Sequence, residues 1–301
     1  MSPFAGLRSQ LPSLAMAART TPVALSIAGS DSGGGAGIQA DLKAFAALGV
    51  HGTTAITAIT AQNTVGVTAI HPIPPEIVIA QVRAVQEDIG VDAVKVGMLG
   101  DGTTIAAVAA ALDELPERVP VVVDPVMVSE SGAELLAEDA REALIELILP
   151  RADVLTPNLP EARRLAGLER DFATDPADLA AAVRALGPKA VIVTGGHADG
   201  TDVLVDGGPE PLAIPGELHP DGAAHGSGCT HSSSLAALLA RGVPLREAAV
   251  GAHEAAAAAV GRGLRDIGAG AGPVDVIGIA ERAAADAAAP GSGTGDIIRR
   301  P

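Results

Sequence analysis

Short runs of β-branched residues alternate with longer stretches rich in Ala and Leu along most of this chain. Such alternation predicts repeated strand–helix–strand units. We therefore expect an α/β fold of three layers (α/β/α), with a mostly parallel central sheet and helices on both faces. The expected strands are Val23–Ala28, Thr53–Thr60, Ala93–Val96, Val121–Val123, Val154–Leu155 and Ala190–Val193, with a terminal hairpin from Asp202–Val205 and Leu212–Ile214. The expected helices are Gly37–Leu48, Pro75–Asp88, Thr103–Leu115, Glu138–Ile148, Pro160–Ala166, Ala177–Leu186, Thr230–Ala240 and Leu245–Arg262.

No repeat and no linker-like segment interrupts this alternation, so we expect one domain over residues 21–284. Residues 1–20 contain no acid, and their apolar stretch is interrupted by Pro12 and Ser13, which makes a poor signal peptide. We expect residues 1–20 to be a disordered leader and residues 285–301 to be a flexible tail.

The charge and the aromatic content exclude several classes of partner. A net charge of −16 argues against nucleic acid and against an anionic membrane surface. The chain has no Trp and no Tyr, so it lacks the platforms on which single strands stack. No apolar run approaches the roughly 20 residues that span a bilayer. The single cysteine excludes an internal disulfide and fits a reducing cytoplasm, so we expect a cytoplasmic protein with a small-molecule substrate.

Polar or glycine-rich turns follow four of the expected strands. Because ligands of such folds bind at the carboxyl ends of the strands, this convergence predicts a site there. The four turns are Gly29–Gly37, Asp124-Pro125, Thr156-Pro157-Asn158 and Thr194-Gly195-Gly196-His197.

The segment Ala224–Thr230 holds the only cysteine, Cys229, in a glycine-rich turn that opens an apolar helix. Helix N-termini present unpaired N–H groups and a positive dipole end, and therefore attract anions. We expect Gly226, Ser227 and Gly228 to form an anion hole for a phosphoryl group, in which the thiol ionises more readily than a free one. The alternatives are a tight turn before a helix and a small buried thiol.

Asp124 and Glu161 are the best candidates for metal ligands, because Mg²⁺ is held by one or two carboxylates, waters and substrate phosphates. Each alone also fits a surface or capping residue. Gln62-Asn63 carries two amides, which suit either the edge of a heterocycle or a turn. The loop Gly29–Gly37 matches neither a Walker A loop nor a dinucleotide fingerprint, so it is either a site or a flexible turn. Asp41, one turn into the next helix, either faces the site or complements the helix dipole.

Taken in order, these segments resemble the hydroxymethylpyrimidine/phosphomethylpyrimidine kinase family of thiamine biosynthesis, within the ribokinase-like superfamily. The resemblance covers about residues 23–275. It implies the ribokinase-like fold, with ATP and Mg²⁺ as cofactors. The stretches that carry it are Ala28–Lys43, Ala61-Gln62-Asn63-Thr64, Lys95-Val96-Gly97-Met98-Leu99, Asp124-Pro125-Val126-Met127, Thr156–Ala162, Gly195-Gly196-His197 and His225–Thr230.

The resemblance implies ATP-dependent phosphorylation of 4-amino-5-hydroxymethyl-2-methylpyrimidine, and then of its monophosphate to the diphosphate. Cys229 takes the position of the catalytic base, behind the anion hole. The residues implied for the pyrimidine are Gln62 and Asp41 at its edge and Gly29, Met98 and Val126 along its pocket. Those implied for ATP and Mg²⁺ are Asp124, Asn158, Glu161, Thr194 and Gly196, with Asp124 and Glu161 as metal ligands, partly through water.

One departure concerns Thr194, since the family commonly has lysine before Gly-Gly-His. The cation that this lysine would place at the phosphates is therefore missing. Lys43 and Lys95 are candidates to replace it only because they are lysines. Two alternatives follow from the resemblance: a pyridoxal or pyridoxine kinase on the same fold, and a catalytically silent pyrimidine-binding protein. In each case we expect a homodimer.

Overall fold

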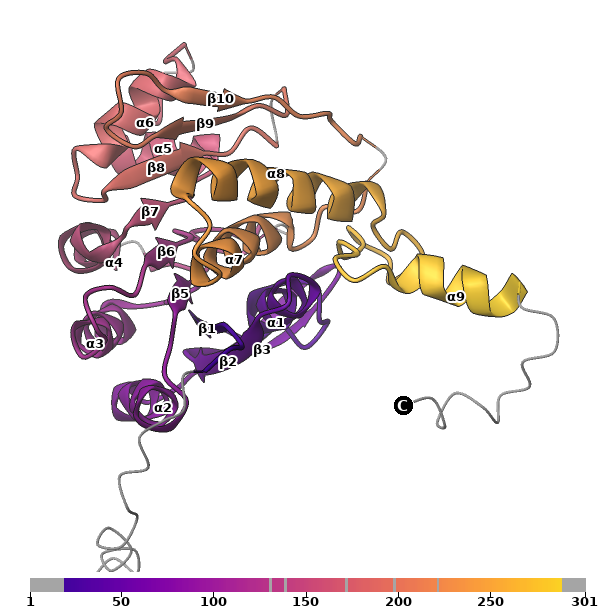
Figure 1. Cartoon of the computed structure of the whole chain (residues 1–301), viewed down its shortest axis with the longest axis horizontal. Helices are drawn as coiled ribbons and strands as arrows, with labels where there is room; N and C mark the ends of the chain where they lie inside the picture. Colours follow the sequence, from indigo (N-terminus) through magenta and orange to yellow (C-terminus); the bar gives the residue numbers. More distant parts are fainter. Residues whose placement is uncertain are drawn as a thin grey trace, which may run out of the picture.

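The computed structural model describes residues 19–288 apart from 130–131, 138–139, 171–172, 197–198 and 221 (Figure 1). A central sheet of eight strands runs in the order β10-β9-β8-β7-β6-β5-β1-β2, parallel from β8 to β2 and antiparallel at β9 and β10. Strands β3 and β4 form a separate hairpin. The strands are β1 Val23–Ala28, β2 His51–Ile56, β3 Ala58–Asn63, β4 Gly66–Pro72, β5 Ala93–Val96, β6 Val121–Val123, β7 Val154–Leu155, β8 Ala190–Val193, β9 Asp202–Val205 and β10 Leu212–Ile214.

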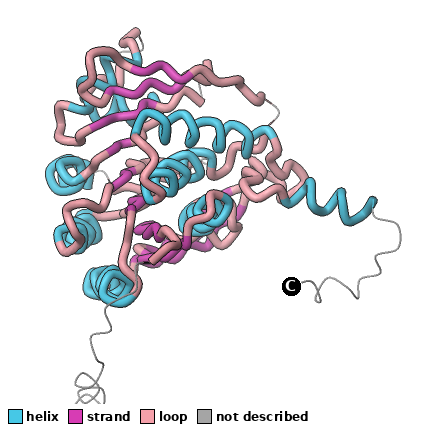
Figure 2. Tube along the Cα trace, viewed as in Figure 1, coloured by secondary structure: helices cyan, strands magenta, loops and turns pink. Residues whose placement is uncertain are grey.

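Helices cover both faces of the sheet, as expected from the sequence (Figures 1 and 2). Helices α2 to α6 pack on one face, and α1, α7 and α8 pack on the other. The helices are α1 Gly37–Ala47, α2 Pro75–Asp88, α3 Gly102–Asp113, α4 Ala140–Ala143, α5 Leu159–Ala166, α6 Pro176–Arg184, α7 Ser227–Ala240, α8 Leu245–Gly261 and α9 Ile279–Ala288, with a π-helical turn at Leu144–Ile148 and a 3-10 turn at Leu149–Arg151.

Alternate residues of each central strand enter opposite layers of the core. In β5, Val94 and Val96 pack with the α2–α6 layer, whereas Lys95 between them lies on the other face, where Asp41 of α1 meets it. In β6, Val122 packs with the α1, α7 and α8 layer. The two-residue period of a strand therefore places one lysine inside the core beneath α1 and α7.

The prediction of one continuous strand over Thr53–Thr60 is wrong, because the chain forms the end of β2 and the start of β3 there. Thr57 donates its N–H to Ala28 O (3.0 Å) and its Oγ1 to Met98 O (2.7 Å), which anchors the chain as it leaves the sheet. The following residues pair instead with β4, which the sequence analysis missed. Strand β4 is exposed over most of its length and ends in a proline, so it shows little of the apolar alternation of a core strand.

The boundaries near the termini also differ from those expected. Arg19, at the end of the expected leader, contacts Asp92 and donates to Gly90 O (2.8 Å). Helix α9 continues to Ala288, past the expected boundary at residue 284. The remainder of the expected leader and the tail beyond Ala288 lie outside the described residues. Among the residues described, no helix is both long and apolar enough to cross a bilayer.

Candidate active site

A cavity of about 460 Å³ lies at the carboxyl ends of the parallel strands. It extends from the β3–β4 hairpin across β5 and β6 to the N-terminus of α7 and the side of α8. The structure brings all but one of the predicted site residues into its lining. The predicted residues that line the cavity are Gly29, Gln62, Met98, Val126, Asp124, Asn158, Glu161, Thr194, Gly196, Gly226, Ser227, Gly228 and Cys229.

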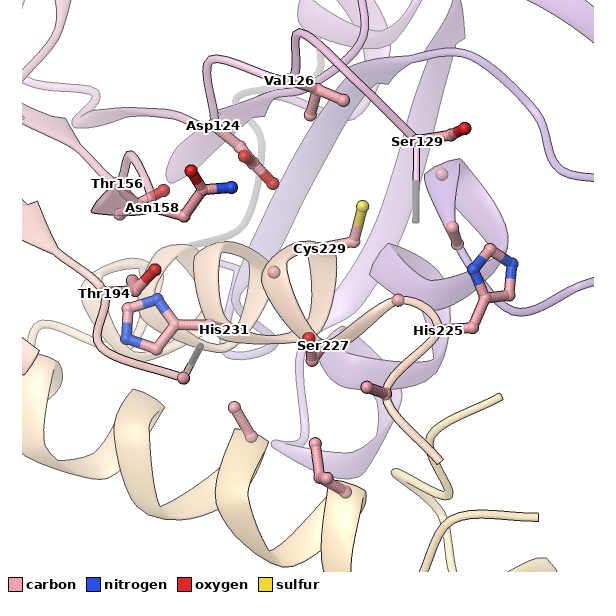
Figure 3. A pocket seen from close by; sticks show the side chains of 18 of the residues that line it. Asp124, Val126, Ser129, Thr156, Asn158, Thr194, His225, Ser227, Cys229 and His231 are labelled. Atoms are coloured by element: carbon pink, nitrogen blue, oxygen red, sulfur yellow. The ribbon is translucent and has the colours of Figure 1, made fainter. Parts of the chain in front are cut away.

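Two helix N-termini converge on Cys229 (Figure 3). The thiol lies in the first turn of α7, and the backbone N–H of Gly37, the first residue of α1, faces it. Ser227 N–H already donates to Ala224 O (2.9 Å). The N–H groups of Gly228 and Cys229 occupy helix positions without an intrahelical acceptor, so they remain for a bound anion.

The ionisation of Cys229 differs from the prediction. Burial raises the pKa of the thiol to about 12, and the charges of Asp124 and Asp41 oppose its ionisation further. The cation of Lys95 and the N–H of Gly37 act in the opposite direction. The half-buried thiol of the unliganded protein is therefore less acidic than the sequence predicts, because desolvation acts against the helix N-terminus.

Asp41 is the predicted site residue that does not line the cavity. Its carboxylate is fully buried below the cavity, where it accepts Lys95 Nζ at 2.9 and 3.1 Å. Ser26 Oγ and Ser233 Oγ each donate to it at 2.5 Å. Both carboxylate oxygens are therefore occupied by partners in the core. Asp41 does not contact the cavity where the pyrimidine edge was expected, and it holds Lys95 in place instead.

Lys95 itself lines the floor of the cavity although its side chain is fully buried. Although burial alone would lower it, the nearby negative charge of Asp41 holds the pKa of Lys95 above its usual value, so Lys95 stays a cation. The sequence analysis gave Lys95 no role beyond residue type. A lysine between valines in a central strand is the signal that points to it.

The loop Gly29–Gly37 is not a flexible turn, because Asp31 organises it. The carboxylate of Asp31 accepts the N–H groups of Gly33, Gly35 and Ala36 at 2.7 to 2.9 Å and contacts Nε2 of His225 at 2.9 Å. Burial alone would raise the pKa of Asp31, but these contacts hold it below its usual value. One buried aspartate thus joins the glycine-rich loop to the segment before α7.

The residues predicted for the pyrimidine form one wall of the cavity. Met98 and Val126 pack together with Leu135, which the sequence analysis missed. A Cβ on Gly29 would lie 3.1 Å from the Met98 sulfur, so the wall is close-packed at that position. The Gln62 amide lies at the rim, where its Oε1 accepts Thr60 Oγ1 (3.2 Å).

Carboxylates lie at the opposite side of the cavity. Asp124 follows β6, is 6% exposed and accepts Ser232 Oγ at 3.1 Å. Glu161 and Asn158 form a capping box at α5, in which Glu161 Oε2 accepts Asn158 N–H (3.0 Å). Burial, and then the charge of Asp124, raises the pKa of Glu161 to about 8. The carboxylates of Asp124 and Glu161 are oxygen donors of the kind that Mg²⁺ prefers, and a cation bound to them would offset the repulsion that raises the pKa of Glu161.

The turn Thr194–Gly196 lies beside these acids, with Thr194 next to Asn158 in a parallel bridge. The two lysines considered as replacements are each bonded to another group of the protein. Lys43 donates to Gly34 O (2.7 Å), and Lys95 is bound to Asp41. His197 falls outside the described residues. Beside α8 the cavity lining is apolar at Ala256, Ala257 and Val260, and the neighbouring lining residues include Glu217, Leu218 and His219.

We expect Gly226→Ala to disrupt this site, because Gly226 has φ +87° and a Cβ there would collide with Gly35 O. Gly242, just beyond α7, is the matched control: its φ is +79°, but nothing lies within 4 Å of its Cβ position. Gly242→Ala should lower the free energy of unfolding by about 1–2 kcal/mol. Gly226→Ala should lower it by a further ~1–3 kcal/mol. Urea unfolding of both variants measures the difference, and equal losses would contradict the close approach.

Comparison with known proteins gives the cavity a context. The family model described as phosphomethylpyrimidine kinase matches residues 31–275. A hydroxymethylpyrimidine/phosphomethylpyrimidine kinase of Rhizobium meliloti is 51% identical over 261 residues, which cover 84% of this chain and 96% of the relative. A hydroxymethylpyrimidine/phosphomethylpyrimidine kinase of Streptomyces coelicolor is 46% identical over 258 residues, which cover 85% of this chain and 94% of the relative.

Solved structures share the fold. A phosphomethylpyrimidine kinase from Clostridium difficile matches with a TM-score of 0.68 and 40% identity, over 78% of this chain and 97% of that one. The Bacillus subtilis pyridoxal kinase in its ADP complex matches with a TM-score of 0.76 and 38% identity, over 85% and 97%. The Staphylococcus aureus pyridoxal kinase with AMP-PCP and pyridoxal matches with a TM-score of 0.76 and 33% identity, over 86% and 94%.

Proposed function

The chain belongs to the phosphomethylpyrimidine kinase family, and from this premise we propose how its cavity performs the reaction. The protein is a kinase that phosphorylates hydroxymethylpyrimidine with ATP, and then phosphorylates the monophosphate to the diphosphate, in thiamine biosynthesis. The observation that carries the mechanism is the position of Cys229. It faces the cavity between two helix N-termini, with the apolar wall of Met98, Val126 and Leu135 on one side and the carboxylates of Asp124 and Glu161 on the other.

Cys229 is the base in this proposal. As the thiolate, formed when the thiol has lost its own proton to solvent, its sulfur accepts the proton of the substrate hydroxyl. The hydroxyl oxygen attacks the γ-phosphorus of ATP, and the bond from that phosphorus to the β-phosphate oxygen breaks to release ADP. The N–H groups of Gly228 and Cys229 stabilise the charge that develops on the transferred group. Phosphoryl transfer needs little covalent chemistry from a protein beyond such positioning and neutralisation.

Asp124 and Glu161 would hold Mg²⁺, partly through water, and the ion would supply neutralisation of phosphate charge. The Asn158 side chain faces the same space (Figure 3). Its Oδ1 accepts Glu161 N–H (2.9 Å), so its amide N–H₂ group remains for a phosphate oxygen. Thr194 and Gly196 lie beside this position and complete the ATP-binding set.

The pyrimidine is assigned to the wall of Gly29, Met98, Val126 and Leu135, with the Gln62 amide at its edge. Without Tyr or Trp, the flat surface comes from the Met98 thioether and the backbone of Gly29. The adenine is assigned to the apolar lining beside α8. The solved complexes of pyridoxal kinases with ADP and AMP-PCP support the use of ATP.

Those same neighbours make pyridoxine the second candidate substrate. We expect kcat/KM for hydroxymethylpyrimidine to exceed that for pyridoxine by at least about tenfold, because the Gln62 amide matches the aminopyrimidine edge. Steady-state assays of both substrates with saturating Mg·ATP measure the ratio. A ratio below one would favour the pyridoxal kinase. Binding of the pyrimidine without turnover of either substrate would favour a catalytically silent protein.

The assembly and location are further parts of the proposal. The β3–β4 hairpin stands apart from the main sheet and leaves Ile59 and Ile70 more than 40% exposed. We assign this hairpin to contact with a second copy, which makes a homodimer in the cytoplasm. Light scattering should give twice the mass of one chain, and the mass of one chain for Ile59→Glu. A monomeric wild type would contradict the assignment.

A further inference from the structure

Two histidines and one aspartate meet in the cavity wall, and nothing in the mechanism above uses them. Asp202 Oδ2 lies 2.9 Å from Nδ1 of His253 and 3.1 Å from Nε2 of His231. Asp202 Oδ1 accepts the N–H of Gly195 at 2.9 Å, so the cluster adjoins the turn that contains Thr194. The three side chains come from β9, α8 and α7 and are 5%, 11% and 6% exposed.

The cluster contains one negative charge for two titratable rings. The hydrogen bond to Asp202 raises the pKa of His253. Burial alone would raise the pKa of Asp202, but the contacts with His231 and His253 hold it well below its usual range. One carboxylate can balance one imidazolium, so an anionic ligand bound beside the cluster would be balanced by a second imidazolium.

His231 is also incompletely bonded. Its Nδ1 is buried and has no hydrogen-bond partner, and the contact of its Nε2 with Asp202 is not aligned as a hydrogen bond. A buried polar atom without a partner is costly unless a ligand satisfies it. Figure 3 shows the ring beside Thr194, on the side of the cavity where Asn158 also lies.

The other described cations near the nucleotide end of the cavity already have partners. Lys95 is paired with Asp41, and His225 with Asp31. A polyphosphate that enters between Asp124 and the first turn of α7 would therefore meet, besides the Mg²⁺ assigned to Asp124 and Glu161, the imidazole of His231, whose nitrogens have no hydrogen-bond partner. Histidine changes its charge near neutral pH, so an arriving anion can draw a proton onto it.

Resting on the proposed use of ATP, we propose that His231 binds the polyphosphate of the nucleotide and takes up one proton from solvent as it does so. The charged and titratable groups that face the ring are Asp202 from β9, Asp124 after β6 and His253 from α8. Lys95 on β5 and Asp41 on α1 neutralise each other. The phosphate supplies the acceptor that the buried His231 ring lacks, and His231 fills the cationic role absent at Thr194.

The test is titration calorimetry with Mg·AMP-PCP in two buffers of different ionisation enthalpy, which counts the protons bound. At pH 7.5 the wild type should take up a fraction of a proton, at most about one. His231→Asn, which cannot be protonated, should lose that uptake and bind about tenfold or more weakly at pH 6.5. His231→Gln repeats the measurement should the first variant fold poorly. The ionisation of the nucleotide is common to all proteins, so the difference between them isolates His231.

Two matched variants sharpen the result. His253→Asn leaves Asp202 to pair with His231 before the nucleotide arrives, so proton uptake should fall while affinity at pH 7.5 is kept. His51→Asn removes an exposed histidine at the start of β2 and should behave as the wild type. Uptake in His231→Asn equal to that of an active wild type would overturn the inference and leave the kinase function standing. A wild type that neither turns over pyrimidine nor binds AMP-PCP would overturn both.

Discussion

Replacement of Cys229 by alanine is expected to lower kcat by about 10²- to 10⁴-fold, the range that a positioned general base contributes. The pyrimidine should still bind with a Kd within about threefold of the wild type, because its wall is made by Met98, Val126 and Leu135. The residual rate would come from the helix N-terminus and the paired carboxylates. Rapid-quench turnover and equilibrium binding separate the two effects. Equal kcat in Cys229→Ala and wild type would remove the thiol from the mechanism.

The pH dependence of the same rate tests the protonation state of Cys229. Burial raises the pKa of the thiol to about 12, so below that pH the thiolate fraction increases about tenfold with each pH unit. At saturating substrates kcat should therefore rise from pH 6.5 to 9 in the wild type. The residual rate of Cys229→Ala should lack this rise. A wild-type kcat that falls over this range would contradict a thiolate base.

Replacement of Lys95 by methionine is expected to have two large effects. It leaves the Asp41 carboxylate buried without its cation, which should lower the free energy of unfolding by about 3–5 kcal/mol. It also removes the charge that favours the Cys229 thiolate. An opposite charge nearby shifts a pKa by about 1–3 units, so kcat at pH 7.5 should fall about 10- to 10³-fold.

The double variant Lys95→Met/Asp41→Asn separates these effects. The buried charge pair is then removed as a whole. Asn at position 41 keeps an oxygen acceptor for one of Ser26 and Ser233 and offers its N–H₂ group to the hydroxyl of the other, so thermal unfolding should return toward the wild type. The kcat should stay below that of the wild type but above that of Lys95→Met, because the charge of Asp41, which opposes ionisation of the thiol, is removed as well. A double variant that is both stable and fully active would show that the ion pair serves the fold alone.

Much of the sheet could be predicted from local sequence. Val23–Ala28, Ala93–Val96, Val121–Val123 and Ala190–Val193 have the predicted bounds, because buried parallel strands are short apolar runs. The β3–β4 hairpin could not be predicted, since β4 is exposed and pairs outside the main sheet. Tertiary contacts at Thr57, and not local propensity, separate β2 from β3.

The predicted site residues come together in one cavity, except Asp41, because the carboxyl ends of parallel strands meet at one edge of the sheet. The errors concern charges brought together from distant segments. The helix N-terminus alone predicts an acidic Cys229 thiol, but the fold adds burial and the charges of Asp124 and Asp41. In the same way, Lys95 and Asp41 are 54 residues apart, and neither position alone indicates their pairing.

The most direct test of the account is a time course of products from hydroxymethylpyrimidine with excess ATP and Mg²⁺, with wild type and Cys229→Ala side by side. Separation of the pyrimidine products by charge distinguishes substrate, monophosphate and diphosphate. For the wild type we expect the monophosphate to rise and then fall as the diphosphate accumulates, and for Cys229→Ala almost no product over the same time. Failure of the wild type to form any phosphorylated pyrimidine at saturating Mg²⁺ would contradict the account.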